Sequence, residues 1–166
     1  QWLGKNLLTL SKLDAQAIIY SPDFISYRDL IHQAIEPLLI SLELKEQTLQ
    51  VRGNLDTQIL IDGNWLTEAL TNIIKNASDH GPQNAPIVIE ASDRPMSHTF
   101  EIINQGMISA KDLPHLFTRF YRGQQAATDS VGIGLAISRE IVVQQGGNIE
   151  VESQAGLTTF RLRFPK

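Results

Sequence analysis

Two asparagines stand one helical turn apart in a stretch whose apolar residues have helical spacing. The stretch reads LTEALTNIIKNASDH, and the asparagines are Asn72 and Asn76. At about 100° per residue both lie on a polar stripe away from the apolar face. Asparagine costs a helix about a few tenths of a kcal/mol, so its repeated use favours a task for the amides. A solvated polar face is the simpler alternative.

A second group that could do chemistry is the glycine pair in VGIGLA, residues 131–136. Gly132 and Gly134 lie between a small, polar stretch without periodicity and the start of an apolar helix. Glycines allow backbone N–H groups to approach an anion, and a helix N-terminus adds partial positive charge, so the pattern favours phosphate binding. A glycine turn without a ligand is the alternative. The sequence lacks a P-loop, and GIGLAI lacks the third glycine or alanine and the preceding strand of a dinucleotide fingerprint.

Composition limits what else the chain does. Its 166 residues are 42% hydrophobic and carry a net charge of -4, which is typical of one globular domain without a footprint for nucleic acid or anionic lipid. The absence of cysteine excludes disulfides, thiolate zinc sites and thiol nucleophiles. No apolar run approaches the ~20 residues that span a bilayer, and no signal-peptide pattern opens the chain, so we expect any membrane anchor outside it.

The first segment has the start of a heptad pattern. Its apolar positions are Leu3, Leu7, Leu10 and Ala17. A helix packed on its own domain and a truncated coiled-coil or bundle helix both fit this spacing. We expect a boundary near Pro22.

The next elements, up to residue 80, are two helices and a hairpin. A helix is predicted over about residues 26–46, with a kink at Pro37. TLQVRG and TQILI, between residues 48 and 61, suit a hairpin. The asparagine helix then starts at Asn64 as N-cap and ends near His80.

The remaining elements supply most of a sheet. Residues 86–92 and 98–104 form a strand pair, and Ser109 with Asp112 resembles a capping box before a short aromatic helix. A mobile loop is expected over residues 123–131, a helix over 134–145, and strands over 148–153 and 158–164. Strands in pairs favour an α+β two-layer sandwich, with a mixed, mostly antiparallel sheet covered on one face by about three helices.

Five motifs in order resemble the catalytic domain of histidine kinases, within the GHKL superfamily and its Bergerat-type ATP-binding fold. NIIKNASDH is similar to the N box, INQGMI to the G1 box, LFTRFYR to the F box, VGIGLAIS to the G2 box and GLTTF to the G3 region. The resemblance covers about residues 25–166. Residues 1–20 resemble the tail of the preceding dimerisation helix.

The resemblance assigns the two asparagines their roles. It implies that Asn76 is the protein ligand for Mg²⁺, a hard cation that prefers oxygen donors, and that Asn72 faces the phosphates of ATP. ATP-hydrolysing relatives have a glutamate where Asn72 stands. Because an amide cannot act as a general base, Asn72 favours a kinase over an ATPase.

Other positions complete the implied site. Gly132, Gly134 and the amide of Leu135 would hold the phosphates, and Arg122 would add positive charge. Asn104 would accept the adenine amino proton, beside Gly106 and with Thr158 near the base through water.

The motifs depart from the family pattern in four places. Asn104 replaces the usual aspartate, which exchanges a charge-assisted bond for a neutral one and weakens binding by about 1 kcal/mol, roughly fivefold. Gly106 lacks a second G1 glycine after it, Asp79 stands where a lysine is common, and Leu157 replaces a G3 glycine.

The histidines receive no catalytic role. They are His32, His80, His98 and His115. None has zinc-site spacing or a phosphoacceptor setting, so we interpret them as structural or surface residues and expect no autophosphorylation by this chain.

The resemblance thus implies a two-part chain. Residues 1–21 would be the end of the dimerisation helix with its linker, and residues 22–166 the domain that binds Mg-ATP and transfers the γ-phosphoryl to a histidine on an absent dimerisation domain of the same protein. Implied with it are a response regulator as partner, a homodimeric full-length protein, and a cytoplasmic position in a membrane-anchored bacterial sensor. A degenerate GHKL domain acting through protein contacts and a GHKL ATPase remain alternatives.

Overall fold

The chain folds around one five-stranded sheet. Its structure, a computed structural model, describes residues 2–121 and 133–166. The strand order is β2-β4-β5-β7-β6, and only the β2–β4 pair is parallel. The strands are β2 (Leu49–Gly53), β4 (Ile87–Asp93), β5 (Ser97–Gln105), β6 (Asn148–Gln154) and β7 (Leu157–Pro165).

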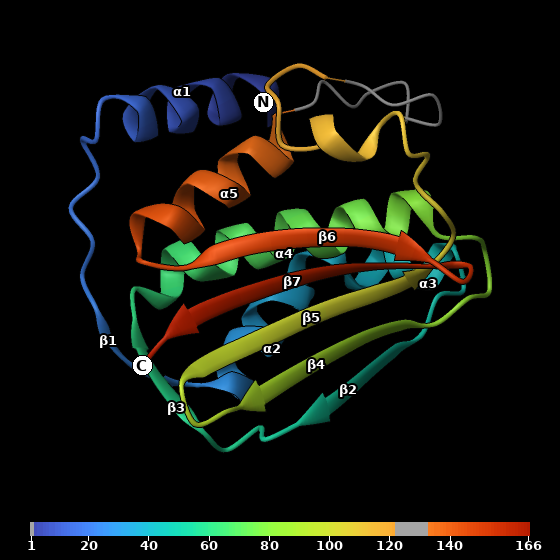
Figure 1. Ribbon diagram of the computed structural model, residues 1–166, viewed down its shortest axis with the longest axis horizontal. Coiled ribbons are helices and arrows are strands. Elements are labelled where there is room, and N and C mark those ends of the chain that lie inside the picture. The colour runs from blue at the N-terminus through green and yellow to red at the C-terminus, as the bar shows by residue number, and fades with distance from the viewer. Residues whose placement is uncertain (1, 122–132) are drawn as a thin grey trace.

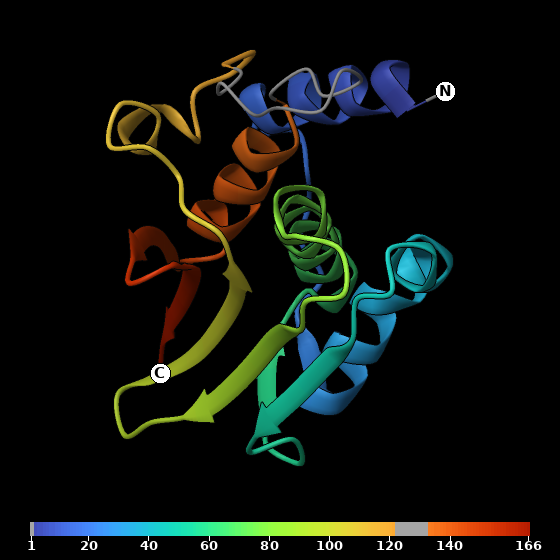
Figure 2. The same ribbon diagram turned by 90° about the vertical axis from the view of Figure 1, so that its right-hand side faces the viewer.

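Helices cover one face of this sheet, as Figures 1 and 2 show. They are α2 (Tyr27–Ile35), the central α4 (Gly63–His80) and α5 (Gly134–Gln144). The inward residues of β7 alternate as expected, and Phe160 and Leu162 are fully buried against the helices. The predicted α+β sandwich is therefore confirmed.

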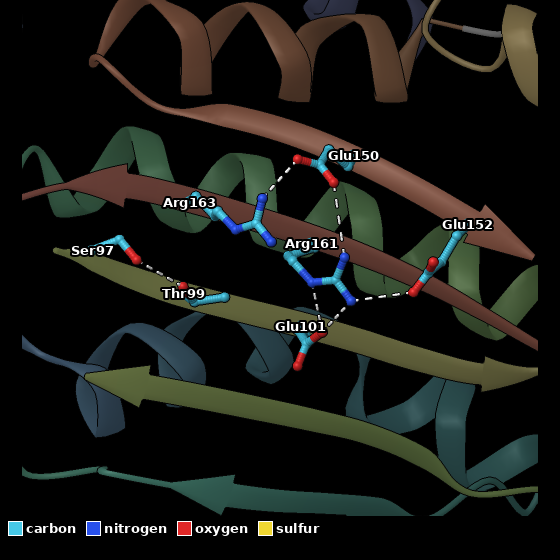
Figure 3. A network of polar contacts seen from close by, with 7 residues as sticks. All are labelled: Ser97, Thr99, Glu101, Glu150, Glu152, Arg161 and Arg163. Atoms are coloured by element: carbon cyan, nitrogen blue, oxygen red, sulfur yellow. Dashed lines mark hydrogen bonds and ion pairs between the residues drawn. The ribbon is translucent and has the colours of Figure 1, made fainter. Parts of the chain in front are cut away.

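The open face of the sheet carries charges that pair with one another. Arg161 on β7 lies within ion-pair distance of Glu101 on β5 and of Glu150 and Glu152 on β6, and Arg163 also pairs with Glu150 (Figure 3). Paired charges of this kind suit a sheet face that meets water, so the apolar core lies on the helical side alone.

The hairpin predicted for residues 48–61 is wrong. β2 pairs with β4, whereas β3 (Gln58–Ile61) pairs antiparallel with β1 (Asp23–Ser26) in a separate two-stranded sheet. The chain leaves β2 through Gly53, whose φ of +110° favours glycine, and the next N–H, of Asn54, donates to the carbonyl oxygen of Ala91 at 2.9 Å. Pairing with β4 thus continues past the end of β2.

The predicted kink at Pro37 is confirmed. The helix expected over 26–46 divides into α2, a 3₁₀ turn at Glu36–Leu38 that contains the proline, and α3 (Leu39–Leu44). This happens because proline lacks the N–H that an unbroken helix needs.

Helix α4 ends at His80 as predicted, but it begins at Gly63, so its N-cap lies two residues before the predicted Asn64. Its N-cap is Asp62, whose carboxylate accepts a hydrogen bond from the N–H of Trp65 at 3.2 Å. Asn64 lies inside the helix and is exposed. Both residue types cap helices, so composition alone did not distinguish them.

The predicted aromatic helix is only a 3₁₀ turn, Leu113–His115. The N–H of Asp112 does donate to the Ser109 hydroxyl, 3.2 Å away, so the expected cap contact forms. The chain does not continue as a helix, since Phe117 turns to pack edge-on against Phe160 and Phe120 takes a φ of +64°.

The first helix, α1 (Trp2–Asp14), packs on α5. Leu10 and Leu13 join the core, whereas Leu7 is 42% exposed and Ala17 follows the helix end. In this structure α1 is therefore packed on its own domain. Within residues 2–121 and 133–166 no helix has both the length and the apolar character needed to cross a membrane.

Candidate functional site

A pocket opens where the end of α4 meets the ends of β5 and β7. The side chains and backbone that line it are Asn76, His80, Asn104, Gly106, Met107, Ile108 and Thr158. Four of the nine predicted binding residues, namely Asn76, Asn104, Gly106 and Thr158, therefore share one pocket although 82 positions separate the first from the last in the numbering.

Strand register brings Asn104 and Thr158 together. The two residues are partners across the β5–β7 pair, and both are buried, with 4% and 1% of their surface exposed. The Asn104 nitrogen Nδ2 donates to the carbonyl oxygen of Gln105 at 2.9 Å. This bond uses one of the two N–H groups of the carboxamide, whose oxygen is an acceptor.

Gly106 makes the turn that closes this end of the pocket. Its φ is +122°, and its N–H donates to the carbonyl oxygen of Gly156 at 2.8 Å. The Thr158 hydroxyl donates to the Gly106 carbonyl oxygen at 2.9 Å and lies 3.0 Å from the Ser153 hydroxyl. Thr158 thus holds the turn in place, so any contact it makes with a ligand is additional to this bond.

The pocket around Asn104 is one end of the site, and a second end lies one helical turn before Asn76 on α4. Here Asn72 meets the start of α5: a Cβ placed on Gly134 would be 3.8 Å from the Asn72 Cγ. Among the described residues the buried Nδ2 of Asn72 has no hydrogen-bond partner. An unsatisfied buried donor costs free energy, which favours a role toward a ligand acceptor such as a phosphate oxygen.

Helix α5 supplies the remaining predicted groups of this second end. It begins at Gly134, and the side chain of Leu135 is buried, which leaves its backbone amide as the group available near the helix N-terminus. Gly132 and Arg122 lie outside the described residues.

His80 belongs to the pocket, which the sequence analysis missed. Burial is the largest influence and lowers the pKa of its imidazole below the ordinary value; Asp79 opposes this shift, and the neighbouring Lys45 and Lys75 add to it. The signal was present in the sequence, because His80 follows Asn76 by four residues and so lies on the same helix face. Met107 and Ile108, which were not assigned roles, also line the pocket.

Asp79 does not line the pocket. Its carboxylate lies 2.9 Å from the Lys75 ammonium in an exposed pair one helical turn apart. Within the part of the chain that the structure describes, no group of three histidine, cysteine, aspartate or glutamate residues could hold a metal ion. A cation bound here would rely on amide oxygens, water and ligand oxygens.

Comparison with known sequences agrees with this geometry. A family model described as "Histidine kinase-, DNA gyrase B-, and HSP90-like ATPase" matches residues 61–166. Sensor protein KdpD of Clostridium acetobutylicum is 30% identical over an alignment that covers 100% of this chain and 19% of that protein. Sensor protein VanS of Enterococcus faecium is 29% identical over 94% of this chain and 41% of its own length. The chain thus spans about a fifth and about two fifths of the length of these relatives.

Solved structures share the fold. The histidine kinase AdeS of Acinetobacter baumannii superposes with a TM-score of 0.83 at 19% identity, over 98% of this chain and 76% of that one. The histidine kinase ThkA, in a complex with the response regulator protein TrrA, superposes with a TM-score of 0.79 at 18% identity, over 99% of this chain and 48% of that one.

Proposed function

Because the chain belongs to the family of histidine kinase-, DNA gyrase B- and HSP90-like ATPases, we propose that it is the catalytic domain of a sensor histidine kinase. Family membership implies ATP binding. The observation that carries the proposal is the pocket that joins Asn76 of α4 to Asn104 of β5 and Thr158 of β7, with Asn72 against Gly134 one turn away. These two ends suit the base and the phosphates of one nucleotide.

In this proposal the base lies at the closed end of the pocket. Asn104 accepts the adenine amino proton through its carboxamide oxygen, and Gly106 and Thr158 shape the turn beside the base. The apolar side chains of Met107 and Ile108 at the same end provide a surface for the ring.

The phosphates extend toward α5. The unpartnered amide of Asn72 donates to them, and the backbone amides at Gly134 and Leu135 meet them at the helix N-terminus. Gly132 and Arg122, outside the described residues, are proposed to complete this end.

Asn76 is the residue proposed to hold Mg²⁺. It lines the pocket between the two ends, and its oxygen is a suitable ligand for a hard cation that takes its other ligands from phosphates and water. When bound, Mg²⁺ neutralises phosphate charge. The residues present fit this ion better than they fit zinc, since His80 is the one histidine that lines the pocket and the chain has no cysteine.

Asn72 favours transfer over hydrolysis. Its neutral amide cannot take a proton from water, so ATP held beside it is not activated toward water by this side chain. In the proposed reaction the bond between the γ-phosphorus and the bridging oxygen breaks, a histidine nitrogen forms the new bond, and ADP leaves with the bridging oxygen. The chain's own groups position ATP and stabilise its charge.

The rest of the protein follows from the proposal. Residues 1–21 would continue a dimerisation helix, the accepting histidine would lie on that absent domain, and the full-length protein would be a homodimer that phosphorylates a response regulator. Sensor relatives and the complex of ThkA with a response regulator support this kind of partner. A cytoplasmic position in a membrane-anchored bacterial sensor belongs to the same proposal.

The test combines the chain, Mg-ATP and a dimerisation domain from the matching protein. We expect phosphohistidine on that domain, and none when Asn76→Ala replaces the wild-type chain. Absence of phosphohistidine under conditions where calorimetry shows bound nucleotide would reject the kinase. Steady phosphate release that depends on Asn76 would instead support an ATPase, and absence of Mg-ATP binding at millimolar concentrations would support a degenerate domain.

A further inference from the structure

Gln47, in the connection between α3 and β2, is a buried polar residue with several bonds to one short segment. Its side chain is 6% exposed. The nitrogen Nε2 lies 3.1 Å from the carbonyl oxygen of Ser78, 3.4 Å from that of Gly81 and 3.3 Å from that of Pro82. The oxygen Oε1 accepts a hydrogen bond from the Ser78 hydroxyl at 2.5 Å. One side chain therefore contacts both the last turn of α4 and the residues that follow it.

These contacts fall where a helix is least secured by its own hydrogen bonds. The last four carbonyl groups of a helix have no partner within it, and α4 ends at His80. Lys45 also reaches this end, with its ammonium 2.5 Å from the Ser78 oxygen and 3.2 Å from the Gly81 oxygen. Lys45 is partly exposed, whereas Gln47 is enclosed, so Gln47 constrains the geometry more tightly.

The segment that Gln47 holds, residues 78–82, includes His80, which lines the pocket. A Cβ placed on Gly81 would be 3.3 Å from the Gln47 Nε2 and 3.9 Å from the Asn104 Cβ, so Gly81 is packed close to both side chains. On the helix side, Asn76 and His80 of the same last turns line the pocket. A shift of Gln47 thus reaches Asn104 through one intervening residue.

We infer that Gln47 is a positioning residue for the nucleotide: it holds the end of α4 and Gly81 so that Asn104 and His80 keep their places in the pocket. Gln47 does not itself line the pocket, so it acts through these residues. The inference rests on the proposed function, since it assumes that the pocket binds the base of ATP.

The decisive variant is Gln47→Leu, which keeps a side chain of similar size and removes every hydrogen bond. We expect it to weaken binding of Mg-ATP about tenfold, because the loss of the bonds to Ser78 and Gly81 frees the segment that includes His80. In a ¹⁵N NMR spectrum the side-chain amide signal of Asn104 should move as well. Gln47→Glu keeps the acceptor for Ser78 but loses the donor, and should weaken binding by an intermediate factor.

Thr71→Val is the matched control. The Thr71 hydroxyl donates to the carbonyl oxygen of Ala34 at 2.8 Å, so this change removes a tertiary hydrogen bond from the same helix, two turns before Ser78 and toward α2. It should lower the free energy of unfolding while leaving Mg-ATP affinity within twofold and the Asn104 amide signal in place. Should Gln47→Leu fail to fold, Ser78→Ala removes only the shortest of the bonds and should weaken binding about threefold.

Unchanged affinity in the Gln47 variants, or an equal loss in Thr71→Val, would overturn the positioning role. A wild-type chain that binds no Mg-ATP would overturn the proposed function itself. The two failures are therefore told apart by the wild-type measurement.

Discussion

At the scale of single residues, Asn104 decides how the pocket can read a base. Its nitrogen donates to the Gln105 carbonyl at 2.9 Å, and its carboxamide oxygen is an acceptor. An acceptor in this place suits the amino group of adenine. The carboxamide can therefore serve the proposed recognition of adenine without any charge on the protein side.

Asn104→Asp should bind Mg-ATP more tightly, up to about fivefold, because a charge-assisted hydrogen bond replaces a neutral one. The same change should lower the free energy of unfolding by about 1 kcal/mol, since the bond to Gln105 is lost. Calorimetry and urea unfolding measure the two effects. Binding that is unchanged or weaker would show that Asn104 does not meet the adenine amino group.

His80 makes the free energy of unfolding depend on pH. Burial lowers its pKa in the folded state, whereas the unfolded chain has the ordinary value of about 6.5. The unfolded state therefore binds more protons as pH falls below that value, so the contribution of His80 to stability is complete above about pH 6.5 and declines on acidification until the folded-state pKa is passed.

Urea unfolding at several pH values between 5 and 8 should accordingly show a smaller pH dependence in His80→Gln than in the wild type. An NMR titration of the wild type should place the His80 pKa below 6.5 in the free protein. A His80 signal that titrates at or above the ordinary value would contradict the assignment.

At the scale of elements, α4 links the two ends of the site, and its start is as well secured as its end. Asp62 caps the helix through Trp65, and its second carboxylate oxygen accepts a hydrogen bond from the N–H of Ser21 at 2.8 Å. Its own N–H donates to Gln145 Oε1 at 2.9 Å. The N-terminus of α4 thereby contacts both the chain before β1 and the end of α5.

Asp62→Ala should lower the free energy of unfolding by about 0.5–2 kcal/mol, the range typical for loss of an N-cap. Asn64→Ala is the control, because Asn64 is exposed within the same first turn and should change stability by less than about 0.5 kcal/mol. Equal effects of the two changes in urea unfolding would reject Asp62 as the cap.

Local patterns predicted the elements better than their partners. The apolar periodicity of α4 and the alternation of β7 follow from which face each buries, and both were predicted correctly. The partner of β2 was not, because the chain after Gly53 is held by a hydrogen bond from Asn54 to Ala91, 37 positions away in the numbering. Pairing across such distances leaves no periodic signal in the sequence.

The same limit applies to the site. Resemblance to a family indicated Asn76, Asn104, Gly106 and Thr158, and the structure brings them to one pocket. It gave no indication of Gln47, whose partner Ser78 lies 31 residues further along the chain. A hydrogen bond between two polar residues so far apart in the sequence can be recognised only from the structure, which brings them together.

At the scale of the whole molecule, the first helix is packed as part of the same body as the pocket. The Gln144 side chain, at the end of α5, donates to the Leu13 carbonyl oxygen at 2.9 Å and accepts from the Tyr20 hydroxyl at 2.7 Å. An ion pair between Asp14 and Arg119 joins the end of α1 to the segment after β5. Figure 1 shows α1 lying along α5 above the central helix. Helix α5 thus carries the proposed phosphate-binding groups at its N-terminus and contacts Leu13 and Tyr20 near its C-terminus.

This packing predicts that α1 and the domain proposed for residues 22–166 unfold together. Leu13 is 1% exposed, so Leu13→Ala should lower the free energy of unfolding of the whole chain by about 2–5 kcal/mol while keeping a single transition. Leu8→Ala, on the same helix but 59% exposed, should change it by less than about 0.5 kcal/mol. Circular dichroism for the helices, and fluorescence of Trp65 for the core in a Trp2→Phe background, should report coincident transitions in urea. If Leu13→Ala instead melted α1 alone and left the main transition in place, the first helix would be a separate unit that only rests on α5, and the boundary proposed near residue 22 would also be a boundary of stability.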